Sequence, residues 1–304
     1  MAKKRKPHAL DQSSLYRLGS KSKLATILGL PSVQALDSLI EAGDARNFRA
    51  YEENDGRPIE YPLDSMADCH EKLAKLLRRI KVPDYVHSQK ERSYVSNAKA
   101  HATGSPVAKT DISKYFPSTS FAHVQRFFRD DLKCPPDVTW YLTKICTYSG
   151  HIPTGSTISN SLAFLANRPM FDQIYCLTAG KGCVMTLLQD DIIISGTGAS
   201  KKLLNEIQMI VRRWGLRTSP KRKKTKTYPA ASAKILTGVL VKGNAITLPN
   251  RRRKMLAESY QVALKAKTKA DRAVAVAKLR GRINEADQID SSAVDPRHRR
   301  LAGL

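Results

Sequence analysis

Two adjacent carboxylates, Asp190 and Asp191, lie inside one of the most apolar stretches of the chain, between Leu187-Leu188 and a run of three isoleucines. Neighbouring carboxylates repel each other and resist transfer out of water, so such a pair requires compensation. A divalent cation would supply that compensation. The alternative is a solvated turn between two core strands, where paired aspartates are also common.

A third carboxylate, Asp111, lies at the end of a second apolar stretch that begins at Val107. A sheet that pairs this stretch with the one around Asp190-Asp191 would bring three carboxylates together. Three oxygen ligands with room for phosphate oxygens suit Mg²⁺. Two such ions about 3.5–4 Å apart can activate an attacking hydroxyl and stabilise the leaving oxygen of a phosphoryl transfer. Without such partners, an aspartate at a strand end is usually only a turn residue.

The elements that must position these carboxylates alternate between strand and helix patterns, which predicts a mixed α/β fold. A strand at 107–112 and a hairpin at 184–196 supply the sheet. Asp64 or Ser65 is placed to cap a helix with an apolar face that extends to Ile80. Apolar spacing predicts the other elements, which are helices at 23–28, 33–41, 121–149 and 203–214, a hairpin at 48–62 with a turn at Asn54-Asp55-Gly56, a hairpin at 235–248, and basic helix from residue 251.

The charge of the 304-residue chain is strongly positive, with 52 Lys plus Arg against 27 Asp plus Glu and a net charge of +25. Residues 217–304 carry 22 basic and 6 acidic residues, which indicates a polyanionic partner, nucleic acid before an anionic membrane. No apolar run approaches the about 18–20 residues of a spanning helix. The basic N-terminus lacks the apolar region of a secretory signal. Five cysteines without a CxxC pair favour reduced thiols in a cytoplasmic protein.

Four segments resemble, in order and spacing, the palm motifs of reverse transcriptases. The segment from Asp111 to Phe116 is similar to the first motif, residues 152–160 to the Pro-x-Gly loop, and Gln189-Asp190-Asp191 to the x-Asp-Asp hairpin. Gly215-Leu216 followed by Lys223-Lys224-Thr225 resembles the fourth motif. The resemblance extends over most of the chain.

Two further segments resemble bacterial retron reverse transcriptases in particular. Residues 97–101, Asn-Ala-Lys-Ala-His, match the Asn-Ala-x-x-His signature, and Leu236-Thr237-Gly238 is close to Val-Thr-Gly. The chain departs from the family where Leu188-Gln189 replaces Tyr-Ala and where Thr154 replaces Gln. The fourth motif is also slightly longer than usual, so the sequence does not rank its bases, which are Arg222, Lys223 and Lys224.

The resemblance implies that Asp111, Asp190 and Asp191 are catalytic and hold two Mg²⁺ ions. Phe116 would exclude a ribose 2′-hydroxyl and so select deoxynucleotides, with a core aromatic as the alternative. Gly155 would contribute its backbone to the substrate site. The turn-flanking Arg49 and Arg57 would reach a triphosphate, unless they form only a solvated basic face.

The resemblance also implies RNA-binding residues. For His101, ordering its own loop is the alternative to contacting RNA. For the basic helices, a solvated face is the alternative, but the charge surplus favours binding to a phosphate backbone. The residues expected to bind RNA are Asn97, His101, Thr237, Gly238, Arg251, Arg252, Arg253 and Lys254.

The implied architecture is an α/β right-hand polymerase. It would comprise an N-terminal helical extension (1–47), fingers (48–105), a palm of antiparallel sheet and helices with fingers elements in 117–150 (106–249), and a helical basic thumb (250–304).

The implied function is that of a retron reverse transcriptase, an RNA-directed DNA polymerase acting in antiphage defence. It would copy a cognate structured noncoding RNA with deoxynucleoside triphosphates, starting from a guanosine 2′-hydroxyl, to give RNA-linked single-stranded DNA. Any effector is expected to be a separate protein, and no membrane is expected as a partner. The alternatives are another prokaryotic reverse transcriptase, of the abortive-infection or intron-derived kind, and a non-catalytic basic RNA-binding scaffold.

Overall fold

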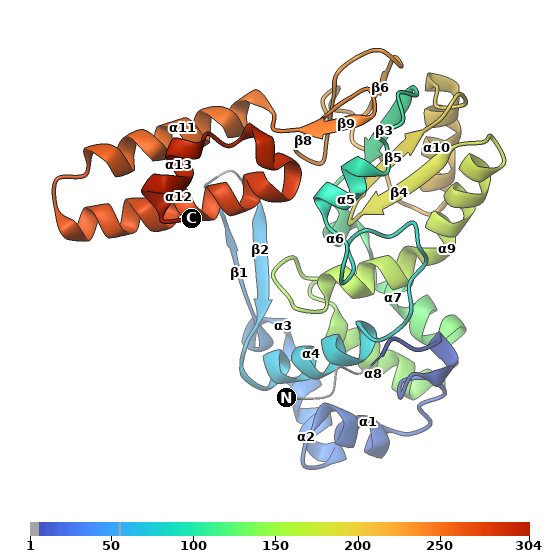
Figure 1. The fold of residues 1–304 in the computed structure, drawn as a ribbon. Helices are drawn as coiled ribbons and strands as arrows, with labels where there is room; N and C mark the ends of the chain where they lie inside the picture. Colours follow the sequence, from blue (N-terminus) through green and yellow to red (C-terminus); the bar gives the residue numbers. More distant parts are fainter. Residues whose placement is uncertain (1–5, 55) are drawn as a thin grey trace. The chain divides into compact units, whose positions relative to one another are not determined.

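The computed structural model describes residues 6–54 and 56–304, so Asp55 at the centre of one predicted turn lies outside the described residues. The chain has the predicted mixed α/β fold, with helices and antiparallel sheets (Figure 1). It divides into two compact units. Unit 1 comprises Met1–Pro83, Ile112–Ile174 and Gln208–Thr218, and unit 2 comprises Asp84–Asp111, Tyr175–Ile207 and Ser219–Leu304.

Unit 1 is mainly helical and carries the predicted hairpin of β1 (Phe48–Glu52) and β2 (Pro58–Pro62). The side chains of Ser20 and Ser32 accept hydrogen bonds from first-turn amides and so cap its first two α-helices. Its helices are η1 (Leu10–Gln12), α1 (Lys21–Leu28), α2 (Val33–Glu41), α3 (Gly43–Asn47), α4 (Asp64–Leu77), α6 (Tyr115–Ser118), α7 (Phe121–Arg126), the π-helical η2 (Phe127–Asp131) and α8 (Pro136–Cys146). Helices α9 (Ser159–Ala179) and α10 (Lys201–Arg213) have residues in both units.

Several predicted boundaries were wrong. The N-cap of α4 is Leu63, without a side-chain hydrogen bond, so neither Asp64 nor Ser65 caps the helix, which ends before Ile80. The predicted helix at 121–149 is interrupted, because Lys133 has a φ of 56° and a new helix, α8, starts at Pro135-Pro136, with Pro135 as its N-cap. The predicted hairpin at 235–248 has three strands, because Thr237 and Gly238 both have positive φ and form a tight turn.

Unit 2 contains a four-stranded antiparallel sheet in the order β4-β5-β3-β6 (Figure 1). Strands β4 (Val184–Leu188) and β5 (Asp191–Ser195) form the predicted hairpin, β3 (Val107–Asp111) pairs with β5, and β6 (Lys226–Tyr228) pairs with β3. Ile192, Ile193 and Ile194 are consecutive and all buried. Because successive side chains of a strand point to opposite faces, both faces of β5 are covered.

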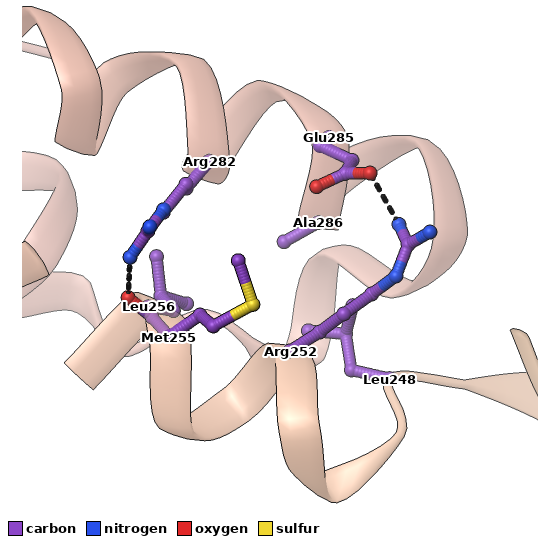
Figure 2. Close-up of a pocket in the computed structure, with 7 residues that line it drawn as sticks. All are labelled: Leu248, Arg252, Met255, Leu256, Arg282, Glu285 and Ala286. Atoms are coloured by element: carbon purple, nitrogen blue, oxygen red, sulfur yellow. Dashed lines mark hydrogen bonds and ion pairs between the residues drawn. The ribbon is translucent and has the colours of Figure 1, made fainter. Parts of the chain in front are cut away.

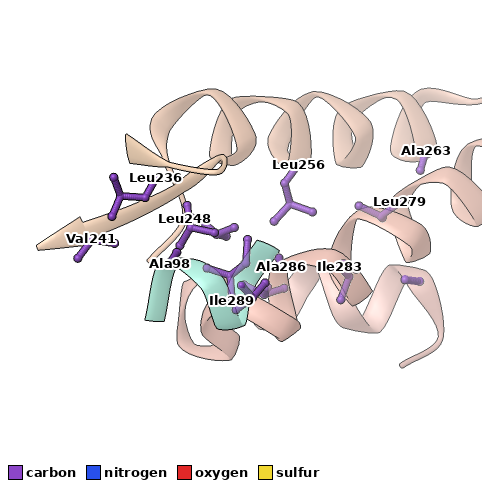
Figure 3. Packing of buried hydrophobic residues seen from close by; sticks show 14 of the residues in the cluster. Ala98, Leu236, Val241, Leu248, Leu256, Ala263, Leu279, Ile283, Ala286 and Ile289 are labelled. Carbon is purple, nitrogen blue, oxygen red and sulfur yellow. The ribbon is translucent and has the colours of Figure 1, made fainter. Parts of the chain in front are cut away.

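The rest of unit 2 is built around a second core (Figure 3). Helix α5 (Tyr94–Lys99) contributes Ala98 to this core, the three-stranded sheet β7-β8-β9 contributes Leu236 and Val241, and the C-terminal helices contribute Leu256 and Ile289. None of the helices within the described residues is long and apolar enough to cross a membrane. The remaining bounds are β7 (Lys234–Leu236), β8 (Val239–Lys242), β9 (Ala245–Thr247), α11 (Asn250–Lys265), α12 (Lys269–Asp290), η3 (Ser291–Ala293) and α13 (Pro296–Ala302).

The core of unit 1 includes a neutral histidine. His70 of α4 is fully buried, with Nδ1 2.5 Å from Ser156 Oγ and Nε2 2.7 Å from the Ile145 carbonyl oxygen. Burial lowers the pKa of His70 to about 4. Folding therefore holds this imidazole in its uncharged form at neutral pH.

Acid should destabilise unit 1 through His70. Because the folded pKa lies below the unfolded value of about 6.5, the unfolded state binds more protons between the two, and stability falls as the pH drops below about 6.5. We expect a change from pH 7 to pH 5 to lower the free energy of unfolding by about 2 kcal/mol through His70. His70→Gln should remove this part of the pH dependence. Urea unfolding at both pH values measures this, and equal pH dependence in the two proteins would contradict it.

Candidate active site

The register of the four-stranded sheet brings the predicted carboxylates to one edge. Asp111, the last residue of β3, pairs directly with Asp191, the first residue of β5. Asp190 lies in the turn that joins β4 to β5, and Gln189 before it has a φ of 58°. Left-handed backbone is unfavourable for a residue with a Cβ, so the tight turn places a strained residue directly before the paired carboxylates. The hairpin of residues 184–195 is called the carboxylate hairpin below.

The carboxylates interact electrostatically. The pKa of Asp190 is raised to about 6, chiefly by burial and then by the charges of Asp191 and Asp111. Burial and the Asp111 charge also raise the pKa of Asp191. Asp111 is only 1% exposed, and its Oδ1 is a buried oxygen with no hydrogen-bond partner among the described residues. A concentration of negative charge at this edge is therefore only partly compensated by the protein.

One basic residue, Lys224, supplies part of the compensation. Its Nζ donates a hydrogen bond to Oδ2 of Asp111, and this contact raises the pKa of Lys224. The loop that presents Lys224 is fixed by the Thr225 hydroxyl, which lies 2.8 Å from Thr110 Oγ1 and donates to the Ser219 carbonyl at 2.6 Å. Of the fourth-motif bases that the sequence could not rank, Lys224 is the one that contacts Asp111.

The donor set at this edge fits a hard divalent cation. Three carboxylates, one with a buried oxygen that has no partner, provide the oxygen ligands that Mg²⁺ prefers. Across the part of the chain that the structure describes, no group of three or more His, Cys, Asp and Glu side chains is already arranged as a metal site. The carboxylates of Asp111, Asp190 and Asp191 would have to turn toward a common point to bind one.

Asn97 and His101 are fully buried and are hydrogen-bonded to the carboxylate hairpin. Thr186 Oγ1 of β4 donates to Asn97 Oδ1 at 3.2 Å and lies 2.7 Å from His101 Nε2, while His101 Nδ1 lies 2.8 Å from Ser195 Oγ of β5. The expectation of direct RNA contact does not fit these positions, because neither side chain has any surface to offer. The alternative, that His101 orders its surroundings, agrees with them.

Thr237 and Gly238 form the turn between β7 and β8, with φ values of 45° and 82°. Thr237 Oγ1 donates to the Tyr94 carbonyl oxygen at 2.9 Å, which attaches this turn to the start of α5. A Cβ on Gly238 would lie 3.0 Å from Nη2 of Arg252. Both residues are partly exposed, and the positive φ accounts for the glycine. Left-handed backbone is unfavourable for the β-branched Thr237, which its bond to Tyr94 helps to hold in place.

The four basic residues at the start of α11, 251–254, differ in their contacts. Arg252 is ion-paired with Glu285 and lies over the Tyr94 ring, and Arg253 donates to the Leu248 carbonyl and to Thr247 Oγ1. Arg251 and Lys254 are exposed, and Lys254 has only a 4.0 Å contact with Glu258. Arg252 is therefore the one of the four whose charge is paired at short range, and Arg251, Arg253 and Lys254 are exposed with charge to offer a phosphate.

Figure 2 shows how Arg252 and Arg282 are held between α11 and α12. They line a cavity of about 20 Å³, which has room for a water molecule but not for a nucleotide. The cavity is lined by Leu248, Arg252, Met255, Leu256, Arg282, Glu285 and Ala286.

Phe116, in unit 1, is partly exposed, while its neighbour Tyr115 is buried and contacts Phe171 edge-on at 6.2 Å between ring centroids. The two adjacent aromatic residues therefore differ in their environments. Tyr115 belongs to the core, and Phe116 keeps a surface for another contact.

The remaining expected substrate residues also belong to unit 1. The Gly155 amide donates to the Glu60 carbonyl of β2 at 2.7 Å, and a Cβ on Gly155 would lie 2.9 Å from that oxygen. Thr154 Oγ1 donates to the Pro58 carbonyl at 2.7 Å, so the Pro-x-Gly loop is bonded to the edge of the β1–β2 hairpin. Arg49 of β1 and Arg57 beside β2 are exposed on that hairpin.

Comparisons with known proteins show which proteins the chain is similar to. No protein-family model matches the chain. Among curated proteins, it is similar to retron reverse transcriptases, as its motifs predicted.

The particular relatives share limited parts of their length with the chain. It is 28% identical to the Retron Se72 reverse transcriptase of Salmonella heidelberg, over 64% of this chain and 54% of the relative. It is 33% identical to the Retron Ec48 reverse transcriptase of Escherichia coli, over 37% of this chain and 28% of that relative. It is 27% identical to the Retron Ec86 reverse transcriptase of Escherichia coli, over 39% of this chain and 37% of that relative. The chain thus spans about half, or less, of the length of the curated relatives it matches.

The ion pair between Lys224 and Asp111 should be measurable without any substrate. Removing the partner of a buried charge is destabilising, but Lys224 is half exposed and water screens the effect. We expect Lys224→Met to lower the free energy of unfolding by about 1–2 kcal/mol, and to have little effect in an Asp111→Asn background. A double-mutant cycle by urea unfolding measures the coupling, and additive effects would exclude the ion pair.

Proposed function

We propose that the chain is an RNA-directed DNA polymerase that copies a structured noncoding RNA with deoxynucleoside triphosphates. The observation that carries the proposal is the pairing of Asp111 with Asp191, with Asp190 in the adjoining turn. Similarity to the Retron Se72, Ec48 and Ec86 reverse transcriptases supports it independently.

Asp111, Asp190 and Asp191 are the catalytic residues of this proposal and would hold two Mg²⁺ ions. When bound, the ions would activate the attacking hydroxyl and stabilise charge on the leaving pyrophosphate. The protein contributes a rigid, apolar sheet edge that keeps the carboxylates together and partly dry, which strengthens their attraction for a cation. Lys224 balances the charge of Asp111 from the solvent side.

The architecture of the proposal is a right hand. Residues 1–47 form the N-terminal extension, 48–105 the fingers, 106–249 the palm and 250–304 the thumb. Exposed thumb cations would bind the phosphate backbone, among them Arg251, Arg253, Lys254, Lys265, Lys267, Lys269, Arg272 and Lys278.

Substrate selection falls to residues of the first unit. Phe116 would exclude the ribose 2′-hydroxyl, and its partial exposure supports this role over that of a core aromatic. Arg49 and Arg57 would bind the triphosphate. Gly155 would act through its backbone, beside a loop that Thr154 fastens to β2.

The retron type of the proposal rests on residues 97–101 and 236–238 and on the named relatives. In it, synthesis starts from a guanosine 2′-hydroxyl of the cognate RNA and gives RNA-linked single-stranded DNA. A separate effector protein and a cytoplasmic role in antiphage defence complete the proposal.

Replacing any one of Asp111, Asp190 and Asp191 with Asn should reduce deoxynucleotide incorporation by at least about a hundredfold, because each change removes a charged ligand. RNA affinity should change less than twofold. Incorporation on a supplied primer–template with Mg²⁺ and a filter-binding assay measure the two quantities. The matched control is Asp137→Asn, because Asp137 is an exposed aspartate of α8. Near-normal synthesis by Asp190→Asn would refute the site, and a wild-type protein inactive with any metal would favour the RNA-binding scaffold.

Phe116→Ala should increase the ratio of ribonucleotide to deoxynucleotide incorporation about tenfold or more, because the steric block to the 2′-hydroxyl is removed. Single-nucleotide kinetics with paired dNTP and rNTP substrates give the ratio. Tyr115→Phe, which keeps the core ring, serves as the control. An unaltered ratio in a folded Phe116→Ala protein would leave Phe116 as a packing residue only.

Priming separates the retron type from other reverse transcriptases. A ribose 2′-hydroxyl is a weak nucleophile, so it requires activation and tight positioning. We expect DNA made on the copurifying RNA to be branched, and a debranching enzyme to release a new 5′ DNA end. Sequencing of the copurifying RNA identifies the template. A linear, primer-derived 5′ end would favour a non-retron reverse transcriptase while leaving the polymerase activity intact.

A further inference from the structure

Helix α5 and His101, two residues after its end, lie between the carboxylate hairpin and the second core of unit 2. Asn97 and His101 bond to the hairpin, whereas Val95 and Ala98 belong to the core shared with the C-terminal helices. Figure 3 shows Ala98 on α5 beside Leu248 and Ile289. One side of this short helix therefore contacts the carboxylate hairpin, and the other packs in the second core.

The contact with the hairpin involves both of its strands. Thr186 belongs to β4 and Ser195 to β5, and both hydroxyls are buried against His101. Thr186 also donates to Asn97 Oδ1, so both hydroxyls and both ring nitrogens of His101 belong to one buried network. Burial lowers the pKa of His101 to about 3, which keeps the imidazole neutral in this network.

A backbone contact fixes the same hairpin from its outer edge. The Leu187 amide donates to the Tyr85 carbonyl, and the His87 amide donates to the Leu187 carbonyl, both at 2.7 Å. His87 Nδ1 in turn lies 3.0 Å from Ser96 Oγ of α5. Leu187 is three residues before Asp190, so this second attachment also leads back to α5.

The opposite side of α5 is attached to the start of the C-terminal helices. The Tyr94 carbonyl accepts from Thr237 at 2.9 Å, and the Tyr94 hydroxyl accepts from Arg252 of α11 at 3.2 Å. The two retron-like segments, 97–101 and 236–238, therefore meet at a single helix.

We propose that Asn97 and His101 are positioning residues, which fix the carboxylate hairpin to α5 and, through α5, to the base of the C-terminal helices. This inference rests on the proposed function, because it assigns the hairpin's carboxylates to metal binding. Ligands must be held within about 0.5 Å of their working positions. The bonds from Thr186 and Ser195 restrict the hairpin close to its carboxylates without touching substrate or metal.

Hydrogen exchange tests the attachment without requiring catalysis. In His101→Gln and Thr186→Val, the amides of residues 184–195 should exchange at least tenfold faster, because the hairpin opens locally more often. His70→Gln is the matched control, since His70 is also fully buried and bonded at both ring nitrogens but lies in unit 1. It should leave exchange in residues 184–195 within twofold of wild type.

Kinetics supply the second measurement. His101→Gln and Thr186→Val should raise the Mg²⁺ concentration for half-maximal synthesis at least threefold and lower the maximal rate, while RNA affinity stays within twofold. Initiation on the cognate RNA and extension of a supplied primer should decrease equally. A loss confined to initiation would overturn the inference in favour of an RNA-positioning role.

The outcomes separate the inference from the function on which it rests. Full activity of Asp190→Asn would refute the proposed site, while the exchange result would still report on the attachment. Unaltered exchange in folded His101→Gln and Thr186→Val would refute the inference, with the polymerase proposal intact. If His101→Gln does not fold, the exchange rates of Thr186→Val and Ser195→Ala test the inference, because each change removes only one hydroxyl of the hairpin.

Discussion

Carboxylates that share one edge of an apolar sheet repel one another, and this repulsion constrains the rest of unit 2. Asp111 is held opposite Asp191 by strand pairing, and besides burial, the charge of Asp111 raises the pKa of both Asp190 and Asp191. The sheet can maintain this arrangement because Ile192, Ile193 and Ile194 are buried and resist any movement of β5. The protein offsets part of this charge with Lys224, which is ion-paired to Asp111, and with Lys109, whose charge acts on Asp191. A buried oxygen of Asp111 has no hydrogen-bond partner among the described residues. The remaining negative charge is what makes the edge suitable for metal ions.

The buried hydrogen bonds between the carboxylate hairpin and the residues Asn97 and His101 help to maintain this arrangement of carboxylates. Buried hydroxyls and a buried imidazole are costly unless every one is hydrogen-bonded. Thr186, Ser195 and His101 satisfy one another, so the interior bonds of the hairpin have one arrangement with low free energy. Apolar side chains at these positions would pack, but they would not specify the same register between α5 and the two strands.

Parts of this arrangement follow from sequence because they depend on local pattern. Asp111, Asp190 and Asp191 stand out since acids are rare within apolar strands, and helix 33–41 follows from its spacing and from Ser32 before it. The role of His101 does not follow, because its partners are 85 and 94 residues away in sequence. Lys224 cannot be separated from its basic neighbours until Thr225 is seen to fix the loop. Arg252 differs from Arg251 only through Tyr94 and Glu285, which belong to other elements.

The division of the chain into two units, each made of three segments, also determines how the protein can be synthesised. Unit 1 requires residues 208–218 before it is complete, and unit 2 requires the segment from Ser219 onward. During translation, the apolar strands β3, β4 and β5 therefore leave the ribosome well before β6, the β7–β9 sheet and α11, which belong to the same unit. Unit 1 is complete only when residue 218 has been made, and two of the three segments of unit 2 precede that residue, so the units do not fold one after the other from separate stretches of chain as consecutive domains do. Folding is slow when contacts form between residues far apart in sequence. Until the later segments are made, the nascent chain exposes unpaired strand edges. Expression at low temperature or with chaperones should therefore benefit this protein more than one whose domains follow each other along the chain.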